Sequence, residues 1–129
     1  MSESRILAEI EACCAHHKIC VLPRNPKKLA CSVWVMPDPA YHVGVIWRQN
    51  TGGMLKGKQF VRFGLPGTPD FTGWLFKSGI RLSIEAKAVL GVLTPDQLSF
   101  ASLARFTGTL HGVIRSYEDC DVWLKQIGL

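Results

Sequence analysis

Three charged residues near the middle of the sequence have the types and the spacing of a metal-dependent hydrolytic site. Asp70 follows a Gly- and Pro-rich turn, and Glu85 and Lys87 stand two residues apart at the end of the next apolar run. Carboxylate oxygens are ligands that Mg²⁺ and Mn²⁺ prefer, and a Lys beside a phosphate orients an attacking water or stabilises developing charge. These residues predict a site for Mg²⁺ or Mn²⁺. The alternative is an exposed hairpin whose Glu and Lys face solvent.

The elements that must position these residues form a β-hairpin. Two strand-like stretches flank a turn at Ser78. Because side chains alternate along a strand, the polar residues of 80–87 share one face and the apolar residues share the other, which we expect to face the core. A reversal about Ser78 sets Asp70 opposite Glu85 or its neighbour Ala86. Two carboxylates and an ammonium group would then converge on one polar face, where a cation relieves the repulsion.

Periodicity and turn signals predict the order α, several β, α, β, α for the whole chain. We expect an amphipathic helix over 3–17 with Ser2 as N-cap, strands over 42–49 and 59–64 joined by a basic loop at 54–58, the hairpin, a helix that ends before Gly108, a strand over 110–116 and a helix over 117–128. The helix before Gly108 begins with a capping box, in which Thr94 is the N-cap and Gln97 the third helical residue. Residues 18–40 contain four prolines and give no clear pattern, apart from a possible strand at Cys31–Met36.

Length and composition limit the fold and the partners. The chain has 129 residues, of which 47% are hydrophobic, so we expect one domain over residues 1–129 with a core of its own. The net charge of +5 suits a polyanionic partner such as DNA. No apolar run approaches the ~18 residues of a membrane span, and the start MSESR is unlike a signal peptide. We therefore expect no membrane partner and a cytoplasmic location.

The cysteines raise the alternative of a zinc site. Five cysteines, an odd number without a CxxC pair, indicate reduced thiols rather than a disulfide framework. Cys14, His17 and Cys20 recur at three-residue spacing, which is compatible with zinc. Structural zinc sites usually present tighter paired knuckles, so we interpret these residues as small core side chains at a helix end.

The order of several short motifs resembles a nuclease family. Pro69-Asp70, fourteen intervening residues and the EAK of 85–87 resemble the PD-(D/E)xK nuclease superfamily. The surrounding blocks WRQNTGG, FVRFGLPGTPD, LSIEAK, LTPDQLSF and GVIRSYED resemble the VRR-NUC family, the virus-type replication-repair nucleases, over about residues 42–120. The resemblance implies an α/β fold with a restriction-endonuclease-like core, that is, a mixed β-sheet flanked by helices in the order α-βββ-α-β plus a C-terminal helix.

The resemblance also implies an activity. It indicates a Mg²⁺- or Mn²⁺-dependent DNA endonuclease of a bacterial or phage type, and specifically a Holliday-junction resolvase that cuts four-way DNA as a homodimer. The alternatives are a flap- or restriction-like nuclease of the same chemistry, and a catalytically silent DNA-binding module.

Individual roles follow from the positions that match the family. Asp70, Glu85, Glu3 and the main-chain carbonyl of Ala86 would hold the metal, and Lys87 would hold the attacking water. Gln97 would lie near the catalytic face, although a capping box by itself explains a Gln there. Arg48 and Asn50 match the family's Arg and Asn and would contact the DNA backbone near the site. Lys56 and Lys58 of the basic loop are also expected to contact DNA, as are Arg62 and Arg115, although each of these two arginines could equally be an ordinary surface charge.

Overall fold

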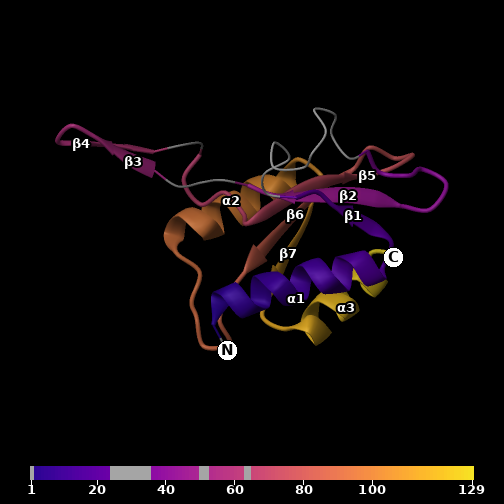
Figure 1. The fold of residues 1–129 in the computed structure, drawn as a ribbon. Helices are drawn as coiled ribbons and strands as arrows, with labels where there is room; N and C mark the ends of the chain where they lie inside the picture. Colours follow the sequence, from indigo (N-terminus) through magenta and orange to yellow (C-terminus); the bar gives the residue numbers. More distant parts are fainter. Residues whose placement is uncertain (1, 24–35, 50–52, 63–64) are drawn as a thin grey trace.

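The protein is an α/β structure in which helices cover both faces of a mixed β-sheet (Figure 1). The computed structural model describes residues 2–23, 36–49, 53–62 and 65–129. In chain order the elements are α1 (Glu3–His16), β1 (Ile19–Val21), β2 (Gly44–Arg48), β3 (Gly53–Lys56), β4 (Gln59–Arg62), β5 (Phe71–Leu75), β6 (Arg81–Ala86), α2 (Pro95–Phe106), β7 (Leu110–Ile114) and α3 (Tyr117–Gln126). Within the described residues, no helix is long and apolar enough to cross a membrane.

The main sheet has five strands in the order β1-β2-β5-β6-β7, and β3 and β4 form a separate hairpin. The two outer pairs, β1 with β2 and β6 with β7, are parallel, and the inner pairs are antiparallel. Phe71 pairs with Ile84 and Trp74 with Arg81. One step beyond Phe71, this register sets Asp70 opposite Glu85, so the predicted hairpin register is confirmed.

Helices α1 and α3 lie on one face of the sheet and α2 lies on the other (Figure 1). On the first face, apolar side chains of both helices and of the central strands form a core of fully buried residues that includes Ile6, Phe71, Ile84 and Leu124. The polar face of β6 is also covered. Ser83 and Glu85 are 0% and 6% exposed, since this face lies beneath α2. The alternative of a hairpin whose Glu faces solvent is therefore wrong for Glu85.

The predicted helices and most predicted strands are confirmed. Ser2 caps α1, and both hydrogen bonds of the Thr94–Gln97 capping box are formed. The expected basic loop at 54–58 is partly wrong, because β3 pairs with β4 and only Gly57 and Lys58 form the turn, with Gly57 at φ +66°. Strand β1 was not predicted, since three residues are too short to show alternation. The possible strand at Cys31–Met36 lies, apart from Met36, outside the described residues.

Candidate active site at the end of β6

Asp70 lies between a turn and the first residue of β5. Its Oδ2 accepts a hydrogen bond of 2.8 Å from the backbone N–H of Ala86. Its own carbonyl accepts a hydrogen bond of 2.8 Å from the N–H of Gln49, which follows β2. Asp70 is thus held from both neighbouring strands, and its carboxylate is directed toward the last residues of β6.

Glu85 is the buried acid of the site. Its Oε1 accepts a hydrogen bond of 2.9 Å from Nε2 of Gln97. Burial, then the charge of Asp70 and a hydrogen bond with it, raise the pKa of Glu85 to about 8, although Lys87 lowers it. In the metal-free protein Glu85 therefore keeps its proton at neutral pH.

Lys87 links the buried acid to the first helix. Its Nζ donates a hydrogen bond of 3.2 Å to Oε1 of Gln97 and lies 4.0 Å from Oε1 of Glu3. Only 13% of the Lys87 side chain is exposed, against 55% of the Glu3 side chain. The ammonium group is therefore fixed in position at the rim of the carboxylate pair.

Gln97 caps α2 and also contacts two charged residues of the site. Its backbone N–H donates to Oγ1 of Thr94 at 3.1 Å, and its side-chain Oε1 accepts from the N–H of Thr94 at 2.9 Å. The same amide group contacts Glu85 through its nitrogen and Lys87 through its oxygen. The cap of α2 thus sets the position of both charged residues.

The donor set fits a hard divalent cation. The side-chain oxygens of Asp70 and Glu85 adjoin each other, and a cation bound there would replace the proton that Glu85 keeps. Ala86 contributes its N–H to Asp70. Glu3 lies farther out. Among the described residues it does not form a close three-carboxylate cluster with Asp70 and Glu85, so it reaches the site through Lys87.

Arg48 pairs with Phe71 across β2 and β5, so its side chain lies on the face of the sheet opposite Glu85. Its guanidinium lies over the ring of Phe71, 5.4 Å from the centroid. Its Nε and Nη1 are buried and donate no hydrogen bond among the residues that the structure describes. The structure therefore does not bring these two nitrogens to the carboxyl groups of the site.

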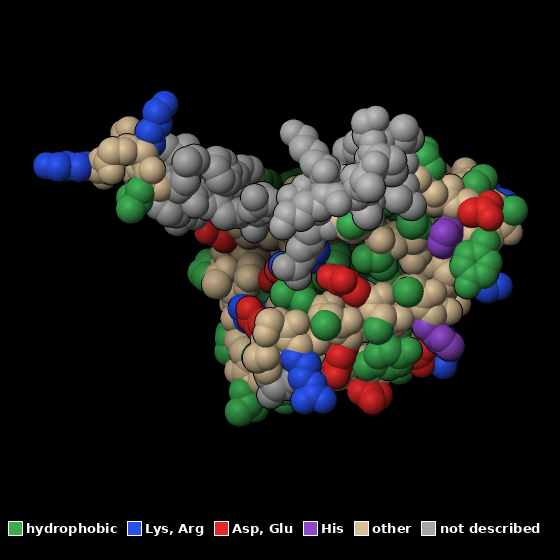
Figure 2. Space-filling model, in the orientation of Figure 1, with side chains coloured by type: hydrophobic (Ala, Val, Ile, Leu, Met, Phe, Trp, Pro, Cys, Tyr) green, Lys and Arg blue, Asp and Glu red, His purple; other side chains and the backbone are tan. Residues whose placement is uncertain are grey.

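Lys56 and Lys58, two of the other expected DNA contacts, lie away from this site. Lys56 and Lys58 are exposed at the tip of the β3–β4 hairpin, which carries basic side chains away from the body of the molecule (Figure 2). Asn50 lies outside the described residues, as does the side chain of Arg62.

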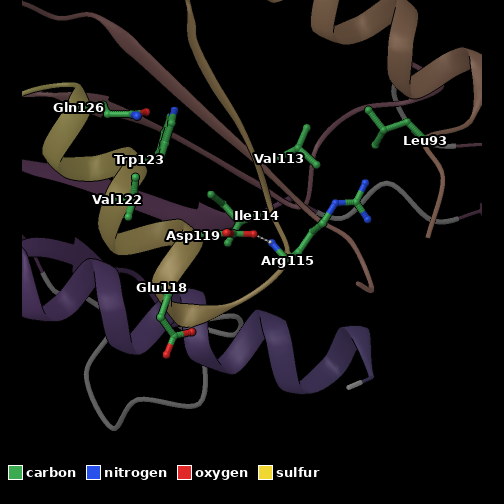
Figure 3. A pocket seen from close by; sticks show the side chains of 9 residues that line it. All are labelled: Leu93, Val113, Ile114, Arg115, Glu118, Asp119, Val122, Trp123 and Gln126. Carbon is green, nitrogen blue, oxygen red and sulfur yellow. Dashed lines mark hydrogen bonds between the residues drawn. The ribbon is translucent and has the colours of Figure 1, made fainter. Parts of the chain in front are cut away.

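Arg115 supports the loop that follows β6. Its Nη1 donates to the carbonyls of Ala88 at 2.6 Å and Gly91 at 2.7 Å. Its backbone N–H donates to Asp119 of α3 at 3.0 Å, and the side chain extends away from α3 (Figure 3). The hollow of about 520 Å³ that Arg115 lines between β7 and α3 contains neither Asp70 nor Glu85. No motif in the sequence indicated this structural use of Arg115.

The turn before Asp70 packs against the start of α2, and Gly67 makes this contact possible. Gly67 has φ +79°, and a Cβ built there would lie 2.2 Å from the carbonyl oxygen of Asp96. We expect Gly67→Ala to lower the free energy of unfolding by about 2 kcal/mol or more, because it adds a backbone clash to the left-handed strain. Gly79→Ala is the matched control, since Gly79 has φ +70° in open space. It should cost about 1 kcal/mol in urea unfolding. Equal losses would contradict the packing role of Gly67.

Comparison of the chain with family models, with curated proteins and with solved structures found no match. The resemblance to the VRR-NUC family therefore stays a prediction from the quoted motifs.

Proposed function

We propose that this protein is a Mg²⁺- or Mn²⁺-dependent DNA endonuclease of the PD-(D/E)xK type, related to the VRR-NUC family. The observation that carries the proposal is one connected group at the end of β6. Asp70 and Glu85 adjoin each other, and the amide of Gln97 joins Glu85 to Lys87. A buried carboxylate beside a second carboxylate destabilises a fold unless a cation or a proton neutralises it, so an ion site would explain the presence of Glu85 next to Asp70.

The residues have distinct tasks in this proposal. Asp70 and Glu85 would hold the ion, and Gln97 would orient Glu85. A bound Mg²⁺ or Mn²⁺ polarises a phosphoryl oxygen and lowers the pKa of a coordinated water. Lys87 would orient the attacking water and offset the charge that develops on the phosphate. Its ammonium group is suited to this because the contacts with Gln97 and Glu3 restrict it before substrate binds.

A polyanionic substrate is supported by charge. The chain carries a net charge of +5. Lys56 and Lys58, which are exposed at the tip of the β3–β4 hairpin, would contact backbone phosphates of duplex DNA.

The proposed substrate is a four-way junction and the proposed assembly is a homodimer. A junction has approximate two-fold symmetry, and a symmetric dimer carries two identical sites related by the same operation. Paired incisions then need no second protein.

A substrate panel tests the activity and the substrate separately. The protein is incubated with supercoiled plasmid and with flap, fork, nicked, single-stranded and four-way DNA, each in Mn²⁺, in Mg²⁺ or in EDTA. The mass of the protein in solution is measured by light scattering. We expect metal-dependent cleavage, fastest on the four-way junction, by a dimer. Equal cutting of linear duplex and junction, or a monomer that only nicks, would overturn the resolvase proposal alone. Binding without cleavage would indicate the silent DNA-binding module and overturn the nuclease proposal.

A further inference from the structure

A second group of metal-ligating side chains lies between α1 and α3, on the opposite side of the sheet from α2. Cys13, His17 and Asp121 each offer one ligand atom, and these three atoms lie within 4.8 Å of one another. The sequence suggested Cys14, His17 and Cys20, but the helix geometry brings Cys13 rather than Cys14 to His17. We propose that Cys13, His17 and Asp121 form a binding site for Zn²⁺, distinct from the carboxylate site at the end of β6.

The secondary structure presents the three ligands in a fixed arrangement. Cys13 and His17 are four residues apart at the C-terminal end of α1, so their side chains lie one turn apart on the same face. Asp121 comes from α3, and its Oδ1 lies 2.7 Å from Nε2 of His17. Since the helices pack against each other and Cys13 is 0% exposed, binding of an ion would cost little conformational entropy.

The donor chemistry fits zinc better than Mg²⁺. Sulfur, imidazole nitrogen and a carboxylate oxygen are the zinc donors, whereas Mg²⁺ prefers oxygen alone. Zinc–ligand bonds of about 2.0–2.3 Å place tetrahedral ligands about 3.3–3.8 Å apart. The observed cluster reaches this range if its longest separations close by about 1 Å and the His17–Asp121 contact opens by about 0.6 Å. Both changes are within the range of side-chain adjustment.

The surroundings supply the rest of the coordination. Asp121 has a side chain that is 27% exposed, so an ion and a fourth, water ligand enter from its side. Its Oδ2 is 2.8 Å from Nζ of Lys125, and this contact remains when Oδ1 binds the ion, as an outer hydrogen bond that orients the ligand. On binding, the Cys13 thiol releases its proton to water and the thiolate bonds to the metal.

Co²⁺ is the probe that tests the site, because a cobalt–thiolate bond gives a charge-transfer absorption band. The reduced wild-type protein is titrated with Co²⁺ and then with Zn²⁺. We expect a saturable band with one equivalent of Co²⁺, displaced by Zn²⁺ but retained in excess Mg²⁺. Cys13→Ser should abolish the band, and His17→Gln and Asp121→Asn should weaken Co²⁺ binding at least about 10-fold.

Two control variants separate this site from other thiols and from the proposed nuclease site. Cys20 is the most accessible cysteine that the structure describes, so Cys20→Ser should leave the band unchanged, as should Asp70→Asn. Since Cys13→Ser changes a buried residue, Asp121→Asn at the rim keeps the test valid if Cys13→Ser does not fold. An absent band in the wild type, or one lost in Cys20→Ser and kept in Asp121→Asn, would overturn the proposal. Neither result bears on cleavage at Asp70.

Discussion

Asp70→Asn and Glu85→Gln are each expected to lower Mn²⁺-dependent cleavage of DNA by about 100-fold or more. Each change removes one carboxylate from the pair that would hold the ion, and the transition state then loses the charge stabilisation that the ion supplies. Both variants should fold, because each replaces one member of a mutually repelling pair with a neutral group of the same shape. Cleavage rates at matched Mn²⁺ concentration, with circular dichroism and DNA binding for each variant, provide the measurement.

Matched variants make this result specific. Glu118→Gln alters an exposed carboxylate on α3 and should cut at the wild-type rate. Gln97→Leu removes both side-chain contacts to the charged residues and one half of the capping box, so it should lose activity together with about 1 kcal/mol of stability. Wild-type cleavage by either Asp70→Asn or Glu85→Gln would show that the ion is not held there.

The metal-free protein is expected to lose stability as the pH rises from about 4.5 to about 8. The pKa of Glu85 is raised from 4.5 to about 8 in the fold, chiefly by burial and next by Asp70. Between these two values the folded state keeps a proton that the unfolded state has released, so the free energy of unfolding falls as the pH rises. Each unit of pKa shift corresponds to about 1.4 kcal/mol, so the total change is a few kcal/mol.

His111 contributes to the pH dependence of stability with the opposite sign, so its contribution must be separated from that of Glu85. Its burial lowers its pKa from 6.5 to about 4, so its contribution to stability is lost as the pH falls through that interval. Comparing wild type with Glu85→Gln by urea unfolding in EDTA, at pH 5 to 9, isolates the Glu85 contribution, because His111 is the same in both. As the pH rises, the free energy of unfolding of Glu85→Gln should increase relative to that of the wild type. Saturating Mn²⁺ should remove the pH dependence due to Glu85. Parallel stability curves in EDTA would contradict the raised pKa.

Local patterns in the sequence determined most of the elements and the pairing of the two acids. The turn at Ser78 sets the β5–β6 register, and that register alone places Asp70 opposite Glu85. The Thr94–Gln97 capping box determines where α2 begins. Such features depend on residues close in the chain, whose backbone conformations and hydrogen bonds require little help from the rest of the fold.

Only the tertiary structure decided how these residues act on one another. The alternation of residues along 80–87 predicted that Glu85 lies on a polar face. Packing of α2 on this face buries Glu85 and so raises its pKa. The same packing turns Gln97 from a cap into a link between Glu85 and Lys87. Likewise, only the contact between α1 and α3 brings Asp121 to Cys13 and His17, over a hundred positions away. Burial and long-range contacts depend on how whole elements pack against one another. The free energy of this packing is a sum over side chains that are far apart in the sequence, so no single stretch of sequence predicts it.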